Sequence, residues 1–296
     1  MSESPRRSGL AVILGRPNVG KSTLINALVG EKVSIVTHKA QTTRHRIVGL
    51  LTRDNTQIGL VDTPGLHRGG GHALNRVMNE TAAGSVAGVD LALLVVEAGR
   101  WRDEDAQALS VAASGGVPVG LIVNKVDRVT PREALLPFIE SLGREHDFAF
   151  VVPLSARRED NLEPLVDEIA RFMPAGEFLF DDDQLSDRDL RFMVAETVRE
   201  KLTLLLHQEL PYSLAVNVDA WEEVDGLLRI GAVIWVARDS QKAIVIGSGG
   251  ATLKEVGRRA RLELAKRLDR RLHLSLWVKV REHWPDDEAA VRGFGH

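Results

Sequence analysis

The sequence contains no cysteine. This absence excludes disulfide bonds, thiol catalysis and zinc sites built on thiolates, and it suits a reducing compartment. No apolar run approaches the roughly 20 residues that a membrane-spanning helix needs. The N-terminal stretch MSESPRRSG also lacks the apolar core of a secretory signal. We therefore expect a cytoplasmic protein.

A strong net charge is also lacking, because the formal value is −3 over 296 residues. The average charge therefore does not by itself predict a nucleic-acid-binding protein. The hydrophobic fraction of 44% and the charged fraction of 27% are those of an ordinary globular protein. The length is sufficient for two compact domains.

The first part of the chain alternates short apolar runs with segments of helical length. Buried strands that alternate with helices predict a mostly parallel, doubly wound sheet, in which ligands bind beyond the carboxyl ends of the strands. HRIVGLL and TQIGLVD, joined by the turn TRDN, predict a hairpin and so one antiparallel strand. The apolar runs are residues 10–14, 58–62, 91–98, 119–125 and 150–156.

A proline, a glycine and an aspartate run then predict a linker. Ser186, with Asp189 three residues later, predicts a capping box that opens a helix. The predicted elements after the linker are, in order, a helix, two strands, a short strand that turns into a long helix, and a last strand. This order predicts a small α+β domain. The expected boundaries are 8–175 for the first domain, 176–186 for the linker and 187–296 for the second domain.

The stretch GRPNVGKS, residues 15–22, matches the phosphate-binding loop pattern G-x-x-x-x-G-K-[ST]. Gly15 and Gly20 would let backbone amides approach a phosphate. Lys21 would contact the β- and γ-phosphate oxygens, and Ser22 would offer a hydroxyl to Mg²⁺.

Further motifs follow in the order expected for a guanine-nucleotide site. Asp62 in LVDTPG would hold Mg²⁺ through water, and Gly65 would donate its amide to the γ-phosphate. Asp127 in NKVD can accept hydrogen bonds from two guanine N–H groups that adenine lacks. The predicted nucleotide contacts are Gly15, Arg16, Pro17, Asn18, Val19, Gly20, Lys21, Ser22, Thr23, Asp62, Thr63, Pro64, Gly65, Asn124, Lys125, Asp127, Ser155, Ala156 and Arg157.

The hydrolytic machinery is less complete in the sequence. A threonine must sense the γ-phosphate through Mg²⁺, and we favour Thr43 over the alternative Thr42. We expect Asn18, Lys21, Thr43 and Gly65 to act in catalysis, and Ser22, Thr43 and Asp62 to hold the metal. Leu66 stands where many GTPases carry a water-positioning glutamine, and the neighbouring His67 is a candidate base. We expect slow basal turnover, and Asn18 raises the hypothesis that K⁺ binds against the phosphates.

A second glycine-rich turn, IGSGG, lacks a lysine after its last glycine and so cannot be a second triphosphate loop. Its G-x-x-G spacing is that of the loop with which KH domains clamp single-stranded nucleic acid. Many basic residues crowd the segment that follows, which favours RNA binding. The predicted RNA contacts are Ile246, Gly247, Ser248, Gly249, Gly250, Lys254, Arg258 and Arg261. For Trp277 and Trp284 we expect core packing or the filling of a domain interface, with base stacking as the alternative.

Taken together, these motifs closely resemble the Era family of bacterial GTPases. The stretches that carry the resemblance are the phosphate loop with its QTTRHRIVG extension, DTPGLH, NKVD, ELPYSLAVNV, IGSGGATLKEVGRRAR and LWVKVRE. The resemblance implies a GTPase domain followed by a type II KH domain. It also implies a role in assembly of the 30S ribosomal subunit and 16S rRNA maturation, with contact to the 3′ end of 16S rRNA. The sequence departs from the family at Ser248, where relatives usually have lysine.

Three other interpretations compete with this one. A membrane-associated signalling or cell-cycle switch is the main alternative, and the family resemblance implies a peripheral contact with the inner membrane. A tRNA-modifying GTPase would need a C-terminal cysteine motif, and a double-domain ribosome GTPase would need two lysine-bearing loops. We therefore expect a monomeric, GTP- and Mg²⁺-dependent RNA-binding GTPase.

Overall fold

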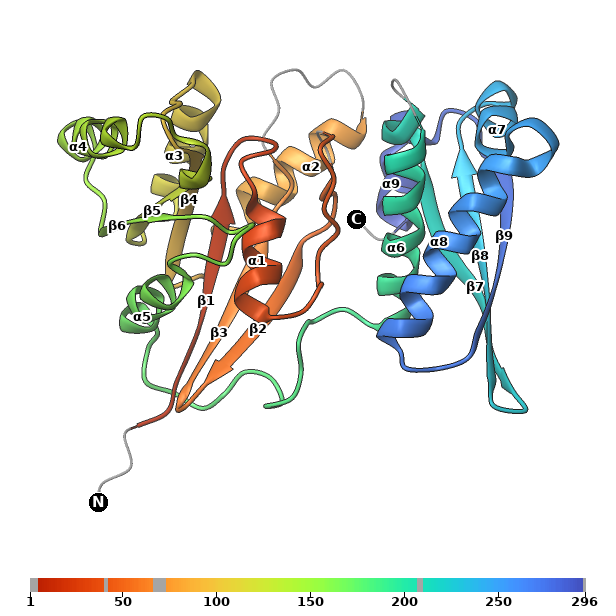
Figure 1. Ribbon diagram of the computed structural model, residues 1–296, viewed down its shortest axis with the longest axis horizontal. Coiled ribbons are helices and arrows are strands. Elements are labelled where there is room, and N and C mark those ends of the chain that lie inside the picture. The colour runs from red at the N-terminus through yellow and green to blue at the C-terminus, as the bar shows by residue number, and fades with distance from the viewer. Residues whose placement is uncertain (1–4, 40–41, 66–72, 207–209, 295–296) are drawn as a thin grey trace. The chain divides into compact units, whose positions relative to one another are not determined.

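The computed structural model describes residues 5–39, 42–65, 73–206 and 210–294. These residues form two compact units (Figure 1). The described parts of 1–34, 43–70 and 78–187 make the first unit, and those of 35–42, 71–77 and 188–296 make the second.

The first unit is built around a six-stranded sheet with the strand order β2-β3-β1-β4-β5-β6. All neighbouring pairs are parallel except β2 and β3, which form the expected antiparallel hairpin from Ile47 opposite Asp62 to Arg53 opposite Thr56. The predicted mostly parallel sheet is therefore confirmed. The strands are β1 (Arg7–Leu14), β2 (Ile47–Arg53), β3 (Thr56–Asp62), β4 (Leu91–Glu97), β5 (Val119–Asn124) and β6 (Phe150–Leu154).

Helices cover both faces of this sheet because neighbouring residues of each buried strand point to opposite sides. Ile13 of β1 packs in one core with α1 and α5, whereas Leu14 packs in a second core with α3 and α4. The helices are α1 (Lys21–Val29), α2 (Ala73–Gly84), α3 (Asp103–Ser114), α4 (Leu135–Glu145) and α5 (Leu162–Phe172), with 3₁₀ turns η1 (Val126–Arg128) and η2 (Arg132–Ala134).

The segment after α5 runs along the edge of the sheet. The amide of Leu50 in β2 donates to the Leu185 carbonyl over 3.0 Å, and Gly49 pairs with Ser186 in an antiparallel bridge. The side chain of Gln57 accepts hydrogen bonds from the amides of Leu179 and Phe180, both over 2.9 Å. This segment therefore forms part of the first unit.

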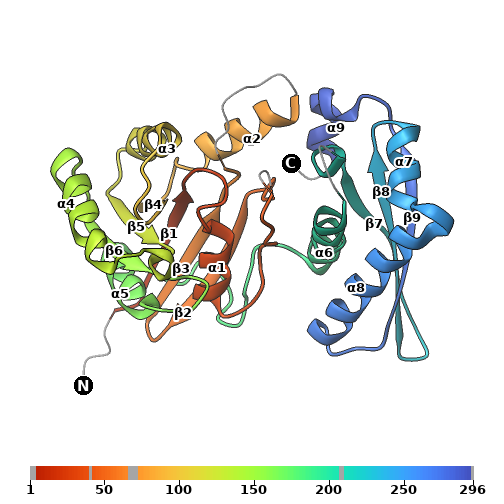
Figure 2. The same cartoon turned by 45° about the horizontal axis from the view of Figure 1, so that its top comes forward.

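The second unit has a three-stranded sheet in the order β7-β8-β9, with α6 and α8 packed on one face (Figure 2). The pair β7–β8 is antiparallel and the pair β8–β9 is parallel. The elements are α6 (Leu190–Leu205), η3 (Leu210–Ser213), β7 (Ala215–Val224), β8 (Leu227–Val236), α7 (Asp239–Ile246), η4 (Ser248–Gly250), α8 (Ala251–Arg267), β9 (Leu272–Val280), η5 (Trp284–Asp286) and α9 (Glu288–Gly293).

Two local predictions for this unit are wrong. Helix α6 begins after Asp189, whose carboxylate accepts the Phe192 amide over 2.8 Å, so Ser186 is not the cap. Ser186 is instead paired with β2. The apolar run expected as a short strand is helix α7, and the Gln241 side chain stabilises the approach to it by accepting the Ala237 amide over 2.9 Å. Short β-branched runs are ambiguous between strand and helix, and tertiary context decides.

Within the described parts of the chain, none of the helices combines the length and apolarity required to cross a membrane.

Candidate functional site

The phosphate loop (residues 15–22) connects β1 to α1, and both of its glycines are sterically required. Gly15 has φ +148° and a Cβ there would lie 2.4 Å from the carbonyl oxygen of Val95. Gly20 has φ +105° and its Cβ would lie 2.4 Å from Nδ2 of Asn124. Approaches this short are not tolerated, so the packed strand ends behind the loop dictate glycine at both positions.

Lys21 is buried beneath the loop, where its ammonium donates to the carbonyl oxygens of Gly15 (2.8 Å) and Arg16 (3.1 Å). Burial lowers its pKa to about 8, although the charge of Asp62 opposes that shift. A Cβ on Gly65 would lie only 3.3 Å from the Lys21 Nζ. The structure therefore brings these two predicted catalytic residues together.

Three hydroxyl groups converge on the carboxylate of Asp62 at the end of β3. Its Oδ2 accepts hydrogen bonds from Ser34 (2.7 Å), Ser22 (3.0 Å) and Thr43 (3.3 Å). Ser22 and Thr43 also lie 2.8 Å apart. Burial raises the pKa of Asp62, whereas these hydrogen bonds and the charge of Lys21 oppose it. Sequence analysis did not identify Ser34.

The oxygen groups of Asp62, Ser22 and Thr43 fit a magnesium ion. The Oδ1 atom of Asp62 is buried and has no hydrogen-bond partner among the described residues, so this carboxylate has capacity for a further ligand. Magnesium prefers hard oxygen ligands of this kind. Thr42, the alternative threonine, lies elsewhere, because its hydroxyl contacts the Thr37 hydroxyl over 2.6 Å.

Asn124, at the end of β5, joins three segments of the site. Its Nδ2 donates to the carbonyl of Val19 (2.9 Å), and its Oδ1 accepts the amides of Lys125 (2.7 Å) and Ala156 (3.0 Å). The side chain of Lys125 donates to the carbonyl oxygen of Asn18 over 2.6 Å. The NKVD segment is thereby tied to the phosphate loop.

Asp127 lies on η1 and is oriented by Ser155, whose hydroxyl donates to its Oδ1 over 2.6 Å. This hydrogen bond lowers the pKa of Asp127, so the carboxylate is ionised at neutral pH. An ionised carboxylate at this position can accept two N–H donors of a guanine. Arg157 is exposed at the edge of the site.

The other predicted contacts of this site lie around the loop. Asn18 is exposed and has φ +63°, and the hydroxyl of Thr63 donates to the carbonyl of Ile13 over 2.8 Å. Val19 and Pro64 are buried, whereas Pro17 and Thr23 are half-buried. Leu66 and His67 lie outside the described residues.

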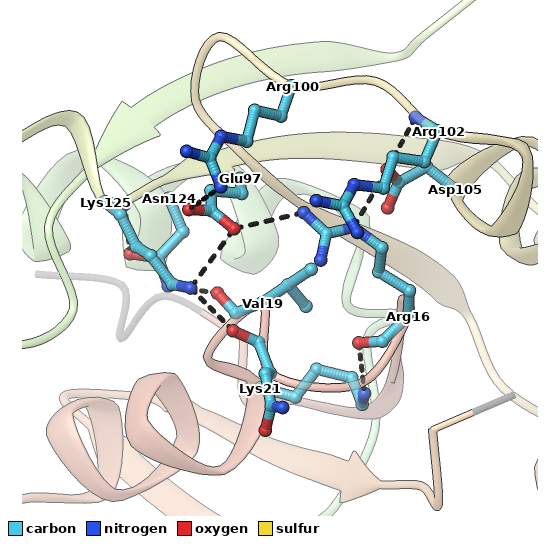
Figure 3. Close-up of polar contacts among 10 residues, drawn as sticks. Arg16, Val19, Lys21, Glu97, Arg100, Arg102, Asp105, Asn124 and Lys125 are labelled. Atoms are coloured by element: carbon cyan, nitrogen blue, oxygen red, sulfur yellow. Dashed lines mark hydrogen bonds and ion pairs between the residues drawn. The ribbon is translucent and has the colours of Figure 1, made fainter. Parts of the chain in front are cut away.

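Two carboxylates that sequence analysis missed hold the side chain of Arg16 (Figure 3). The Arg16 Nη2 donates to Glu97 Oε2, and its Nε donates to Asp105 Oδ2, both over 3.1 Å. Glu97 is the last residue of β4, so its place at the carboxyl end of a parallel strand was a usable signal. Asp105 carried no such signal in the sequence. An acidic residue in the first turn of a helix is ordinary, and the Asp105 carboxylate does accept the Arg102 amide at the start of α3, as a helix-capping residue does.

The second glycine turn (residues 247–250) connects helix α7 to helix α8, and not a strand to a helix as expected. Gly247, Gly249 and Gly250 all have positive φ, and a Cβ on either of the last two would meet nothing within 4 Å. Ser248 is exposed beside them, and Ile246 is half-buried at the end of α7. The turn therefore presents open backbone at its two last glycines.

A groove of about 470 Å³ runs from Gly250 between α8 and β9, and it is lined by the predicted Lys254, Arg258 and Arg261. Arg258 is paired with Glu255 over 2.8 Å, and this pair lowers the pKa of Glu255 to about 2. Within the described chain, Lys254 and Arg261 have no acidic group within 4.0 Å. These two cations remain available to a polyanion.

The two tryptophans differ in their environment. Trp284 is fully buried and its ring contacts Phe294 edge-on at 5.1 Å, as packing predicts. Trp277 is 50% exposed on the sheet face opposite α6 and α8, so the expectation of core packing is wrong for this residue.

Comparison with protein families assigns each unit separately. Residues 10–125 match a family described as 50S ribosome-binding GTPase, and residues 209–285 match the KH domain. The chain is 52% identical over 296 residues to GTPase Era of Xanthomonas oryzae pv. oryzae (strain MAFF 311018), which covers 100% of this chain and 99% of the relative. It is 51% identical to GTPase Era of Stenotrophomonas maltophilia (strain K279a) over 297 residues, covering 100% of both chains.

Solved structures similar to this chain belong to the same family as these relatives. A single-residue variant of Aquifex aeolicus Era bound to GDP·AlF₄⁻ matches with a TM-score of 0.94 and 39% identity, over 98% of this chain and 99% of that chain. The same values describe the match to Era in complex with MgGDPNP and nucleotides 1506–1542 of 16S ribosomal RNA. The predicted GTPase fold followed by a KH domain is thus confirmed, and the chain belongs to the Era family of GTPases.

Proposed function

We propose that this Era-family GTPase binds the 3′ end of 16S rRNA through its KH unit and assists assembly of the 30S ribosomal subunit. The observation that carries the proposal is that one chain combines a guanine-nucleotide site with an open cationic groove beside a G-x-x-G turn. The Era complex with a GTP analogue and a 16S rRNA segment supports it by similarity. The proposed GTP-binding and KH domains comprise residues 8–175 and 187–296.

In the proposed mechanism, the residues around the phosphate loop bind GTP and orient its γ-phosphate. Lys21 exchanges its two loop carbonyls for phosphate oxygens, and Gly65 beside it offers its amide to the γ-phosphate. Asp127 selects guanine, because an adenine would leave its carboxylate without donors. Asn124 fixes the loops on both sides.

Ser22, Thr43 and Asp62 would hold Mg²⁺, since their oxygens already converge. When bound, Mg²⁺ supplies positive charge against the phosphate oxygens during hydrolysis. We infer that Thr43 senses the γ-phosphate through Mg²⁺, because its hydroxyl lies beside Ser22 and Asp62 in the oxygen cluster that would hold the metal. On this proposal, Thr43 is the residue that distinguishes GTP from GDP.

Potassium is proposed as a further cofactor on the basis of Asn18. Its side chain is exposed at the tip of the phosphate loop, and its carbonyl is held by Lys125. We expect single-turnover hydrolysis to be at least about fivefold faster in KCl than in NaCl, since a cation facing the transition state accelerates phosphoryl transfer. Asn18→Ala should remove the difference. Equal rates in the two salts would refute the role of potassium.

RNA binding is tested with a short single-stranded oligonucleotide from the 3′ end of 16S rRNA and a scrambled control, at fixed salt. We expect sequence-dependent binding that is tighter with a non-hydrolysable GTP analogue than with GDP. Coupling of this kind requires the RNA to raise GTP affinity by the same factor. Equal, weak binding to both oligonucleotides would refute the RNA-binding part of the proposal.

The groove is tested by Lys254→Glu, which reverses one of its two available positive charges. We expect at least about a tenfold loss of RNA affinity, because a phosphate contact becomes a repulsion. Arg132→Glu makes the same change at an exposed position of the first unit and should leave RNA affinity within about twofold.

The alternative, a switch at the inner membrane, rests on the same cations, because Lys254 and Arg261 could also meet anionic lipid. Salt-sensitive binding to anionic vesicles, without preference between the two oligonucleotides, would favour it. We propose a monomeric, cytoplasmic protein with at most a peripheral membrane contact. Sedimentation equilibrium at micromolar concentration tests the monomeric state.

A further inference from the structure

A buried cluster of four charges lies behind the nucleotide site, and the sequence motifs do not include its acidic members. Arg16 comes from the phosphate loop, Lys125 from the NKVD segment, Glu97 from the end of β4 and Asp105 from α3 (Figure 3). The Glu97 side chain is 15% exposed, that of Arg16 is 8% exposed and that of Asp105 is fully buried. The cluster is therefore largely removed from solvent.

Glu97 contacts both cations with a single oxygen atom. Its Oε2 lies 3.1 Å from Nη2 of Arg16 and 3.4 Å from Nζ of Lys125. We propose that Glu97 is a positioning residue for guanine-nucleotide retention, which acts by holding the phosphate loop and the guanine-binding lysine in one ion-pair cluster. This inference rests on the nucleotide-binding part of the proposed function.

The backbone contacts show how Glu97 would act on the nucleotide without touching it. Arg16 is itself a residue of the phosphate loop, so its ion pair with Glu97 acts on the loop directly. The Lys125 ammonium donates to the Asn18 carbonyl at the tip of the same loop. A carboxylate that holds Arg16 and Lys125 together therefore restrains the phosphate loop at two of its residues.

The charges of the cluster balance, with two cations and two anions. Burial tends to raise the pKa of Glu97, but the hydrogen bonds and charges of Arg16 and Lys125 outweigh it and hold the pKa below its usual range. Glu97 is therefore ionised at neutral pH. Without it, Arg16 and Lys125 would repel each other with only Asp105 to compensate within the cluster, and an uncompensated charge in a poorly solvated place is strongly unfavourable.

Arg100 provides a matched control. Its guanidinium lies 3.7 Å from the other oxygen of Glu97, but its side chain is 62% exposed. An exposed pair of this kind contributes little. Replacing Arg100 therefore disturbs Glu97 without removing the link between the two loops.

The test uses the full-length protein loaded with a fluorescent GDP, whose dissociation is followed after a chase with excess GDP. Glu97→Gln should dissociate the label roughly tenfold faster or more, as expected for loss of a charge-assisted contact. Its single-turnover hydrolysis at saturating protein should fall by a clearly smaller factor than retention, because Glu97 does not contact the reacting groups. Glu97→Asp keeps the charge and should restore most of the retention, and Arg100→Ala should stay within about twofold of the wild type.

A double variant separates a shared cluster from independent contacts. Arg16→Gln combined with Glu97→Gln should release GDP more slowly than the product of the two single effects predicts, because the Arg16–Glu97 pair can be lost only once, although the loss of the Arg16–Asp105 pair adds its own effect. Effects that multiply would overturn the proposal, as would a Glu97→Gln protein that retains GDP like the wild type. Equal losses of retention, hydrolysis and melting temperature in both the Gln and Asp variants would show a merely structural role and overturn it too.

The wild-type measurement distinguishes this inference from the function on which it rests. A wild-type protein that fails to hold the labelled GDP would refute nucleotide binding itself, and the positioning role with it. A wild type that holds GDP while Glu97→Gln behaves identically would refute the positioning role alone.

Discussion

The phosphate loop and the glycine turn of the KH unit have similar sequences but differ in what requires their glycines. At Gly20 a methyl group would meet the amide of Asn124 at 2.4 Å, whereas at Gly250 it would meet nothing within 4 Å. The first loop is already closed around its own lysine and held by side chains from the ends of neighbouring strands. The second turn is open beside its last two glycines.

Under the proposed function, the two sites would bind phosphate in different ways. The phosphate loop is pre-organised, so little ordering is required when a nucleotide binds, and its specificity can be high. The KH turn offers bare backbone and nearby cations, an arrangement that tolerates many positions of a flexible strand. The predictions below test this contrast, beginning with the largest expected effect.

Gly20→Ala should reduce nucleotide affinity at least about a hundredfold, because the new methyl group displaces Asn124 and with it the link between the loops. Titration with a fluorescent GDP measures the loss. Gly30→Ala, at the opposite end of α1, is the matched control, because Gly30 also has positive φ but a Cβ there has open space. A similar loss of affinity in both variants would show that backbone strain, and not the steric conflict, is responsible.

Asp127→Asn should lower GTP affinity about a hundredfold and raise affinity for xanthosine triphosphate, which presents an acceptor where guanine presents a donor. Competition between the two nucleotides for the labelled site gives both values. Asp160→Asn removes an exposed charge nearby and should change neither affinity. Unchanged discrimination in Asp127→Asn would place the guanine contact elsewhere.

Gly249→Asp should weaken RNA binding about tenfold, since aspartate tolerates a positive φ but repels phosphate. Gly226→Asp is the control, because Gly226 also has positive φ and open space, in the turn between β7 and β8 of the same unit. Filter binding of the 16S oligonucleotide measures both. Equal weakening by the two variants would mean that the RNA responds to overall charge and not to the turn.

Raising the pH should weaken nucleotide binding through Lys21, whose pKa burial lowers to about 8 in the nucleotide-free protein. Phosphates favour the protonated lysine, so affinity should fall about fourfold between about pH 7 and about pH 8.5. The free energy of unfolding of the nucleotide-free protein should instead increase as the pH rises. The unfolded lysine keeps its proton up to about pH 10.5, so stability rises with pH above about 8.

Calorimetric titration and thermal melting at the two pH values test both trends. Lys21→Arg retains a charge that does not titrate in this range and should show a flat profile. A pH dependence that persists in Lys21→Arg would assign the effect to another group.

Most of the candidate GTPase site was predictable because its motifs are contiguous. The glycines of the phosphate loop, Lys21 and Asp127 each stand at a fixed place in a short pattern that follows a buried strand. Ser34, Glu97 and Asp105 escaped prediction because each is a single residue that reaches the site only through folding. A carboxylate in an ordinary sequence context indicates nothing until its partners are known.

The errors in the second unit have a related cause. The run that forms α7 has strand-like composition, and its helical state depends on contacts such as Gln241 to the Ala237 amide. Ser186 had the right type and spacing to cap a helix, but its backbone is engaged with β2, and Asp189 takes that role. Local sequence patterns predicted where helices and strands lie along the chain, whereas contacts with distant residues determined whether a segment is a helix or a strand and where it begins.

The segment that follows α5 has a consequence for the solubility of the isolated GTPase unit. Strand β2 is an edge of its sheet, and an uncovered edge is a template for pairing with another molecule. Leu185 and Ser186 occupy that edge, and Asp187 adds contacts to Val48. A fragment ending at residue 175 should therefore self-associate, whereas one that extends through Asp187 should carry its own protection against aggregation.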